Sequence, residues 1–322
     1  MSHIIDMSNY RENMAYVGKV PWHGLGQQLT PDAPLEVWAS EAGMSHVIKR
    51  AAVQFQTPSV GTYGVMSERD VLYRSDTIAP LAVVSNRFKI VQPREVLEFF
   101  RDLVSATGDY VLETAGLLNG GARYWALAKY RDTLEFGRDI VKPFLMLATA
   151  CDGSMNTIAQ HTSVRVVCNN TLQMALRATG DGVIKVSHRT AFNSDSVKAE
   201  LGIDNAITQY REDVTALINQ SITTAESVDI LVQLIGKRDD LGALTNEKNT
   251  KRIVGEIMQN LANSPGAQLD TAAGTGWGLM NAVTRYVDFD TRARSQNNRF
   301  NSGQFGPGAK LKREAFELII AA

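Results

Sequence analysis

Cysteine is scarce in this sequence, and long apolar runs are absent. The 322 residues include two cysteines, Cys151 and Cys168, too few for a disulfide scaffold and typical of free thiols in a reducing compartment. No stretch approaches the roughly 18 uncharged apolar residues that span a bilayer. Nothing at the N-terminus joins basic residues to an apolar segment. We therefore expect a cytoplasmic protein with no membrane partner.

The chain also lacks a net charge of either sign, with a formal value of −1. As a whole it has no electrostatic attraction for nucleic acid, so any such attraction must come from a local patch. Residues 285–313 carry seven Lys or Arg and two Asp, a net +5, which leaves −6 on the rest. Because this segment is also poor in aliphatic residues, it predicts a mobile basic arm near 291–313. The alternative is a solvated loop whose charge is incidental.

Hydrophobic residues make up 44% of the chain, enough to bury a large core. Residues 111–130 read as two strands joined by Asn119-Gly120-Gly121, a turn that tolerates positive φ. Further strands are predicted at 62–75, 80–92, 143–151, 156–167 and 183–189, and helices at 35–41, 93–104 and 169–178. This order predicts an α+β fold, an antiparallel sheet of hairpins backed by helices.

The pattern becomes helical after about residue 190. Ile207, Tyr210, Val214 and Leu217 are spaced to form one apolar stripe of a long helix, which favours packing within the chain over pairing with another subunit. Further helices are predicted at 225–235, 247–262, 277–287 and 310–320. We therefore expect a sheet domain over residues 1–190 and a helical region over 191–322.

Candidates for catalysis are few. Cys168 stands where a strand is predicted to meet a helix, and a helix N-terminus lowers a thiol pKa, so His161 or His188 could serve as its base. The plainer alternative is a small buried hydrophobe. Close cysteine pairs of the C-x-x-C type are absent, and the glycine-rich residues 274–278 lack the lysine of a nucleotide loop. We expect no metal, no cofactor and no enzyme activity.

Cations recur on the predicted strands, with aromatic residues between them. Arg87 and Lys89 lie on one predicted strand, and Arg123 and Trp125 share a face of another because alternate residues point the same way. Such rows can follow the phosphates of a single strand while aromatic rings stack on its bases. The alternative is the outer face of a half-solvated sheet. The predicted nucleic-acid-binding residues are Arg87, Lys89, Arg123, Trp125, Lys129, Arg165, Lys185, Arg189, Arg292, Arg294 and Arg299.

Four motifs resemble the phage/plasmid-like protein family, an uncharacterised family of phages and mobile elements. They are WHGLG at 22–26, DGS at 152–154, RVVCNNTL at 165–172 and GTGWGLMNAVTRYVD at 274–288. The resemblance spans nearly the whole chain and implies a bacterial host cell, but it implies no activity. Cys151 stands where relatives have a histidine before the DGS triplet, which weakens any mechanism that needs that histidine.

The order hairpin, strand, strand, helix over residues 111–178 is similar, by topology alone, to the core of single-strand annealing proteins. That resemblance implies a homo-oligomer that holds single-stranded DNA in a basic groove and promotes annealing without a cofactor. Arg123, Lys129, Arg165, Lys185 and Arg189 would line the groove. Two alternatives stay open: a hydrolase-like enzyme using Cys168 and a histidine, and an interaction or inhibitor protein that contacts a host factor.

Overall fold

The computed structural model describes residues 13–18, 26–58, 61–165, 171–173, 183–201, 203–237, 239–240, 242–294 and 296–322. Within them, nine strands form one sheet in the order β11-β10-β9-β7-β6-β1-β2, with β12 beside β10 and β8 beside β9. All neighbours are antiparallel except β1 and β2. The strands are β1 (Met14–Val17), β2 (Gln27–Leu29), β6 (Tyr110–Leu118), β7 (Arg123–Tyr130), β8 (Leu134–Phe136), β9 (Asp139–Ala150), β10 (Thr157–Arg165), β11 (Thr171–Gln173) and β12 (Val183–Val186).

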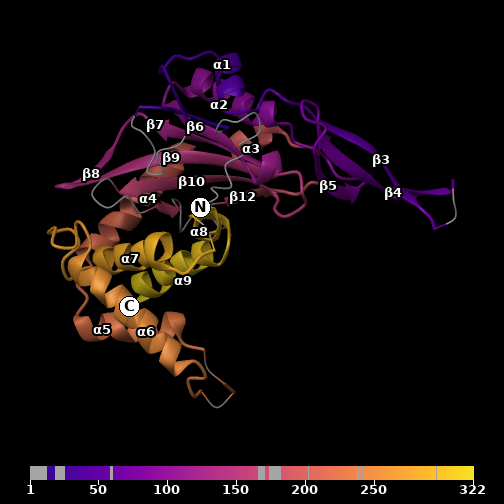
Figure 1. The fold of residues 1–322 in the computed structure, drawn as a ribbon. Helices are drawn as coiled ribbons and strands as arrows, with labels where there is room; N and C mark the ends of the chain where they lie inside the picture. Colours follow the sequence, from indigo (N-terminus) through magenta and orange to yellow (C-terminus); the bar gives the residue numbers. More distant parts are fainter. Residues whose placement is uncertain are drawn as a thin grey trace.

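A second sheet extends away from the body of the molecule (Figure 1). It contains β3 (Ile48–Gln56), β4 (Tyr63–Arg74) and β5 (Pro80–Ser85), all antiparallel. Because β5 pairs only with Arg69–Tyr73 of β4, the distal part of the sheet is a two-stranded ribbon.

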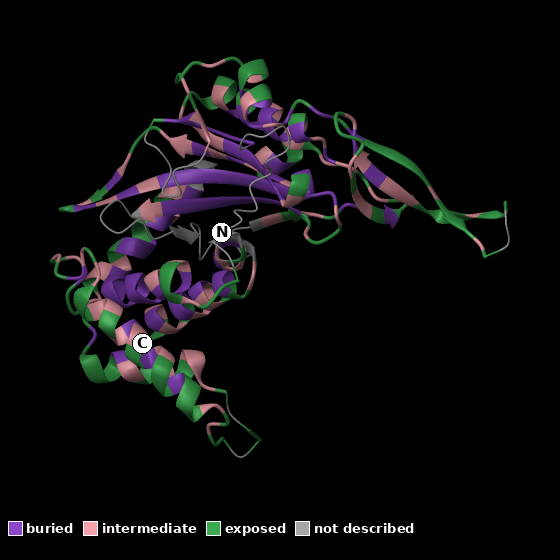
Figure 2. Ribbon diagram, in the orientation of Figure 1, coloured by how far each residue is buried: buried purple, intermediate pink, exposed green. Residues whose placement is uncertain are grey.

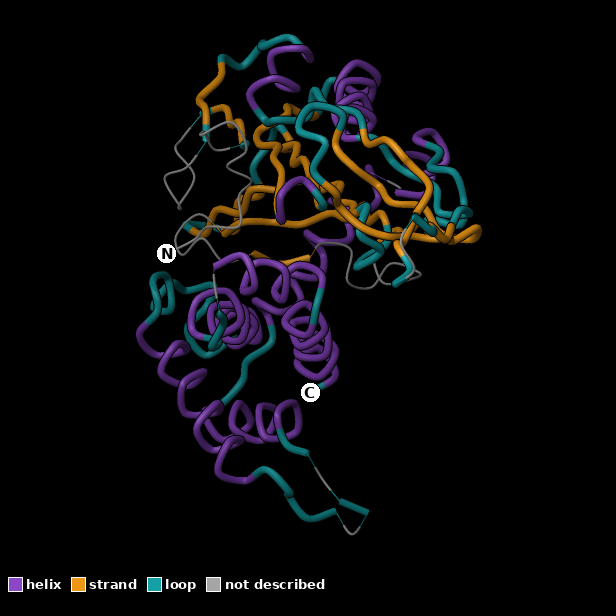
Figure 3. Tube along the Cα trace, turned by 45° about the vertical axis from the view of Figure 1, so that its right-hand side comes forward, coloured by secondary structure: helices purple, strands orange, loops and turns teal. Residues whose placement is uncertain are grey.

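Helices cover the large sheet and form most of the C-terminal half (Figure 3). The N-terminal ones are α1 (Leu35–Glu41), α2 (Pro93–Thr107) and α3 (Ser194–Leu201). Pro93 occupies the first turn of α2, and Gln92 and Glu95 form a capping box there. The C-terminal ones are α4 (Ile203–Asn219), α5 (Thr224–Ile235), α6 (Glu247–Asn263), α7 (Gly276–Arg285), α8 (Gln296–Phe305) and α9 (Pro307–Ala321).

Two apolar cores contact the large sheet. Phe99 and Phe100 of α2 pack on the sheet face that carries Tyr124, Ala126 and Ala128 of β7. The second core lies among α4–α9 and reaches Val141 of β9. Both phenylalanines are almost fully buried, so truncating either to alanine would cost about 3–5 kcal/mol. Figure 2 shows buried residues concentrated in the sheet and in the packed helices.

The α+β prediction, with its antiparallel sheet and helical C-terminal half, is confirmed. Three local predictions were wrong. Residues 171–173 form strand β11 on the edge of β10 instead of the first turn of a helix. Residues 86–89 lie beyond the end of β5. Most of the predicted mobile arm at 291–313 is helical, in α8 and the first turns of α9.

Candidate nucleic-acid interface

Three predicted cations and one aromatic residue do share a face of the large sheet. In antiparallel strands, directly paired residues lie on the same face. Trp125 pairs with Ala148, Ala148 with Ile158, and Ile158 with Lys185. Arg123 and Lys129 occupy the same face because they are two and four residues from Trp125. This face is opposite the one that packs on α2.

The middle of that face is closed. Ala148 is 3% exposed and Ile158 is 7% exposed. A polynucleotide therefore has no access to Ala148 and Ile158, which lie between Trp125 and Lys185 in this row. Arg165 ends β10, where it pairs with Val141. Its side chain lies outside the described part of the structure.

Arg123 and Trp125 have structural contacts. The Arg123 Nε donates to Ser154 Oγ at 3.1 Å and lies 3.9 Å from Asp152 Oδ2, which fixes the turn between β9 and β10. Asp152 also accepts a hydrogen bond from the Ser154 backbone N–H at 2.9 Å. Trp125 packs against the buried side chains of Met14 and Leu118. Both residues stabilise this end of the sheet.

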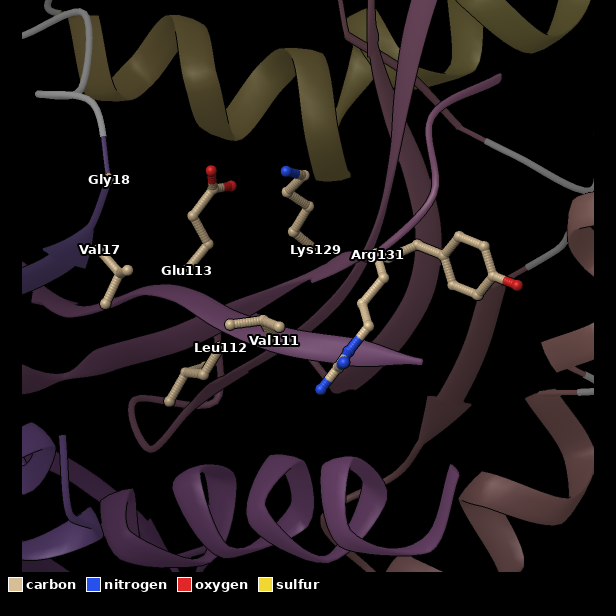
Figure 4. A pocket seen from close by; sticks show the side chains of 8 residues that line it. Val17, Gly18, Val111, Leu112, Glu113, Lys129 and Arg131 are labelled. Atoms are coloured by element: carbon tan, nitrogen blue, oxygen red, sulfur yellow. The ribbon is translucent and has the colours of Figure 1, made fainter. Parts of the chain in front are cut away.

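Lys129 lies at the far end of β7, beside Glu113. Glu113 is the extra residue of a bulge in β6, and it points to the side of the sheet opposite Leu112 (Figure 4). Burial raises the pKa of its carboxyl group, and the positive charges of Lys129 and Lys142 partly offset that rise. Glu113 and Lys129 help line a cavity of about 250 Å³ with Val17, Gly18, Val111, Leu112, Tyr130 and Arg131. A carboxylate beside Lys129 reduces its attraction for phosphate.

Lys185 and three further predicted cations lie in segments that meet at His188. His188 Nδ1 lies 2.9 Å from the Lys89 carbonyl oxygen, and Nε2 lies 3.2 Å from that of Met155. The Lys89 backbone N–H in turn donates to the His188 carbonyl. These contacts join the segment after β5, the segment after β12 and the β9–β10 turn. We call Arg87, Lys89, Lys185 and Arg189 the His188 cluster.

Two further contacts fix this arrangement. The Phe88 ring stacks on the His188 imidazole with centroids 4.3 Å apart. The Arg50 guanidinium donates to the carbonyl oxygens of Asn86 at 2.8 Å and Phe88 at 2.6 Å, and pairs with Asp70 at 2.8 Å. Sequence reasoning missed the roles of Arg50 and Phe88, because their partners lie on segments that are distant in the sequence.

All four residues of the His188 cluster are exposed. Arg87, Lys89 and Arg189 form no ion pair within the described residues. Their charges are therefore accessible to an anion from solvent, unlike that of Arg123. Of the predicted set, Arg87, Lys89 and Arg189 are exposed residues in two segments that the fold joins by hydrogen bonds.

The basic segment near the C-terminus divides into structural and exposed charges. Arg299 donates from Nε and Nη2 to the Thr291 carbonyl at 3.2 and 3.0 Å. Lys312 is 2% exposed and pairs with Asp288 at 2.5 Å. Arg292 and Arg294 are exposed. Two of the three predicted arginines in this segment are therefore available to a ligand.

The candidate catalytic groups are not accessible where the structure describes them. Cys168 lies outside the described residues. His161 is buried, and loss of hydration lowers its pKa to about 4, which keeps the ring neutral. Burial raises the pKa of Cys151 to about 12, so it remains a thiol. Both nitrogens of His188 face backbone carbonyls.

The glycine-rich segment 274–278 is a helix entry. Thr275 caps α7 by accepting a hydrogen bond from the Gly278 N–H at 3.1 Å. Trp277 Nε1 donates to the buried Asp139 carboxylate at 2.9 Å, which joins α7 to the start of β9. Of the WHGLG motif, only Gly26 lies in the described ranges. Its φ of +104° and a Cβ position 2.9 Å from the Met14 carbonyl require glycine.

No group of three or more His, Cys, Asp or Glu residues that could hold a metal ion occurs in the described ranges. The helices described there are all too short or too polar to cross a bilayer.

Comparison with curated proteins and with solved structures gave no match in either case. A family model did match, over residues 80–303, and it covers α2, strands β6–β12 and most of the C-terminal helices. That span contains the His188 cluster and extends into α8. The chain therefore belongs to the family described as domain of unknown function DUF932.

Proposed function

We propose that this protein binds single-stranded DNA and that the His188 cluster is its principal contact with the phosphates. The observation that carries the proposal is the convergence of Arg87, Lys89 and Arg189, exposed and without ion pairs among the described residues, at one place on the surface. Cations held at fixed spacing release condensed counterions from a polynucleotide, which drives binding without sequence readout.

The wider proposal is a phage-type or mobile-element protein of the bacterial cytoplasm that acts in annealing or recombination as a homo-oligomer, without a cofactor. Its support is the resemblance of four motifs and the topology of the sheet. Residues 171–173 of the predicted helix at 169–178 form strand β11, so this topological support extends only to the strands. Arg292 and Arg294 would provide secondary contacts with the polynucleotide.

Fluorescence titration of a labelled single-stranded oligonucleotide over a series of salt concentrations tests the phosphate contact. The logarithm of the binding constant should fall linearly with the logarithm of salt concentration, by about 0.7 for each phosphate neutralised. The double variant Lys89→Ala/Arg189→Ala removes two cations, so its slope should be smaller by about 1.4.

Arg252→Ala is the matched control because Arg252 is an exposed cation on α6, paired with Glu256 at 2.6 Å. It should bind with the wild-type slope. If the wild-type protein does not bind the oligonucleotide, or if the double variant and the control lose affinity equally, the proposed role of the cluster is wrong.

A further inference from the structure

The distal ribbon of β3 and β4 contains no charged residue. Residues 51–67 lie between Arg50 and Glu68 and hold no Asp, Glu, Lys or Arg, although charged residues make up 21% of the chain. A polynucleotide or an anionic surface is recognised by cations. The ribbon therefore fits neither, and its partner must be recognised through apolar side chains and backbone groups.

This ribbon also exposes large apolar side chains. Phe55 is 53% exposed, Tyr63 65%, Val65 60% and Met66 49%. The pairing of Val53 with Met66 and of Phe55 with Gly64 places Phe55 and Met66 on one face, while Tyr63 and Val65 lie on the other. Figure 2 shows the ribbon exposed along its length. Contiguous apolar surface of this kind marks a site of protein contact.

The outer edge of β3 has backbone groups directed away from β4. At Ile48 that edge is occupied, because the Gln92 side chain bonds both the Ile48 N–H at 2.9 Å and its carbonyl at 3.1 Å. Thr57 N–H instead bonds inward, to Thr62 across the hairpin, at 3.1 Å. Since outward and inward groups alternate along a strand, Ala52, Gln54 and Gln56 direct their N–H and C=O groups outward. Among the described residues, β3 pairs with no strand other than β4.

We propose that this edge binds the same edge of a second copy of the chain, antiparallel, with Gln54 on the two-fold axis. The two three-stranded sheets would then form one six-stranded sheet. Ala52 would lie opposite the second copy's Gln56, and Val53 opposite the second copy's Phe55. The Val53, Phe55 and Met66 side chains of both copies would meet on one face, which gives the exposed apolar residues a self-complementary partner.

Charge favours this arrangement. Lys49 and Arg50 stand at the base of the ribbon, so antiparallel pairing puts the two basic pairs at opposite ends of the joint, about 30 Å apart at the usual rise per residue. Parallel pairing would set like charges side by side, which destabilises a sheet. The proposal specifies the contact behind the homo-oligomer proposed above, and it does not depend on DNA binding.

Disulfide cross-linking between single-cysteine variants tests the register. In a Cys168→Ser chain only Cys151 remains, and it is buried. Directly opposite residues in such a pair have Cα atoms about 5.5 Å apart, within reach of a disulfide. Gln54→Cys should therefore cross-link to itself under mild oxidation. Gln56→Cys should not, but a mixture of Gln56→Cys and Ala52→Cys chains should. These positions are exposed, so the fold should tolerate the changes.

Sedimentation without nucleic acid provides the second measurement. The wild-type mass should rise with concentration, and Phe55→Ser/Met66→Ser should remain monomeric. Ile78→Asn is the control, since Ile78 is 68% exposed outside the ribbon; it should associate like the wild type. A wild-type chain that stays monomeric, or Gln56→Cys that cross-links as readily as Gln54→Cys, would overturn the proposal. Cross-linking and sedimentation are both measured without DNA, so an absence of oligonucleotide binding would not change either result.

Discussion

Two histidines that the sequence presents as equivalent candidate bases differ completely in their surroundings. His161 lies on the α2 side of β10, buried and neutral, and its Nε2 has no hydrogen-bond partner among the residues that the structure describes. His188 joins three segments through its two ring nitrogens. Neither difference is encoded within a few residues of the histidine, because each depends on which distant element packs against the strand.

His161 predicts a loss of stability in mild acid. Its pKa is lowered from 6.5 to about 4 in the folded state by burial, so the unfolded chain binds the extra proton first. The resulting stability is complete above pH about 6.5 and is lost as the pH falls towards 4, by about 3 kcal/mol in all. Urea unfolding across this range should show the loss in the wild type and a smaller one in His161→Phe. If the free energy of unfolding falls equally with pH in the two proteins, the role assigned to His161 is wrong.

His188→Ala should weaken the proposed phosphate contact without removing a cation from the cluster. The substitution removes the imidazole contacts with the Lys89 and Met155 carbonyls and the stacking on Phe88, at a cost of about 1–3 kcal/mol in the free energy of unfolding. Because Lys89 and Arg189 would lose their fixed separation, oligonucleotide affinity should fall while the salt slope changes little. Equal affinity in the variant would show that the cluster does not need this support.

At the scale of elements, the position of a helix was easier to predict from the sequence than the pairing of distant segments. The apolar spacing from Val96 to Val104 and the N-terminal Pro93 locate α2 within a few residues. The helix predicted at 169–178 was wrong at Thr171–Gln173, because these residues pair with β10, and the rest of that range lies outside the described residues. Pairing with β10 is not visible in a local window of sequence. Likewise Arg87 and Lys89 follow β5 instead of lying in it, because the strand ends at Ser85.

Gly278 should be irreplaceable at the entry to α7. A Cβ there would lie 1.9 Å from the Ala272 carbonyl oxygen, so Gly278→Ala must displace the backbone that Thr275 caps. We expect a loss of more than about 2 kcal/mol in the free energy of unfolding. Gly255→Ala in α6 is the matched control, because nothing lies within 4 Å of its Cβ position. That change should stabilise the protein by about 0.5–1 kcal/mol. Chemical denaturation of both variants measures the contrast.

At the scale of the whole molecule, the sheet and the helical half are joined by buried polar contacts. Trp277 donates to Asp139 at 2.9 Å, and the hydroxyls of Ser163 and Tyr210 are 2.7 Å apart. From the sequence, Tyr210 was predicted only as one residue of an apolar stripe. Periodicity identifies the buried face of a helix, but it does not identify the hydroxyl group that the Tyr210 hydroxyl contacts. The division of the chain into a sheet domain and a helical region at residue 190 stays a prediction.

The ribbon at residues 51–67 contains no Asp, Glu, Lys, Arg or His. Association of two chains through the ribbon should therefore persist at high salt and at low pH. High concentrations of kosmotropic salt should even strengthen the burial of its apolar side chains. Binding of a polynucleotide through cations should instead weaken as the salt concentration rises. Washing DNA-bound oligomers with about 1 M salt, where the screening length is about 3 Å, should thus release the polynucleotide while the subunits stay associated.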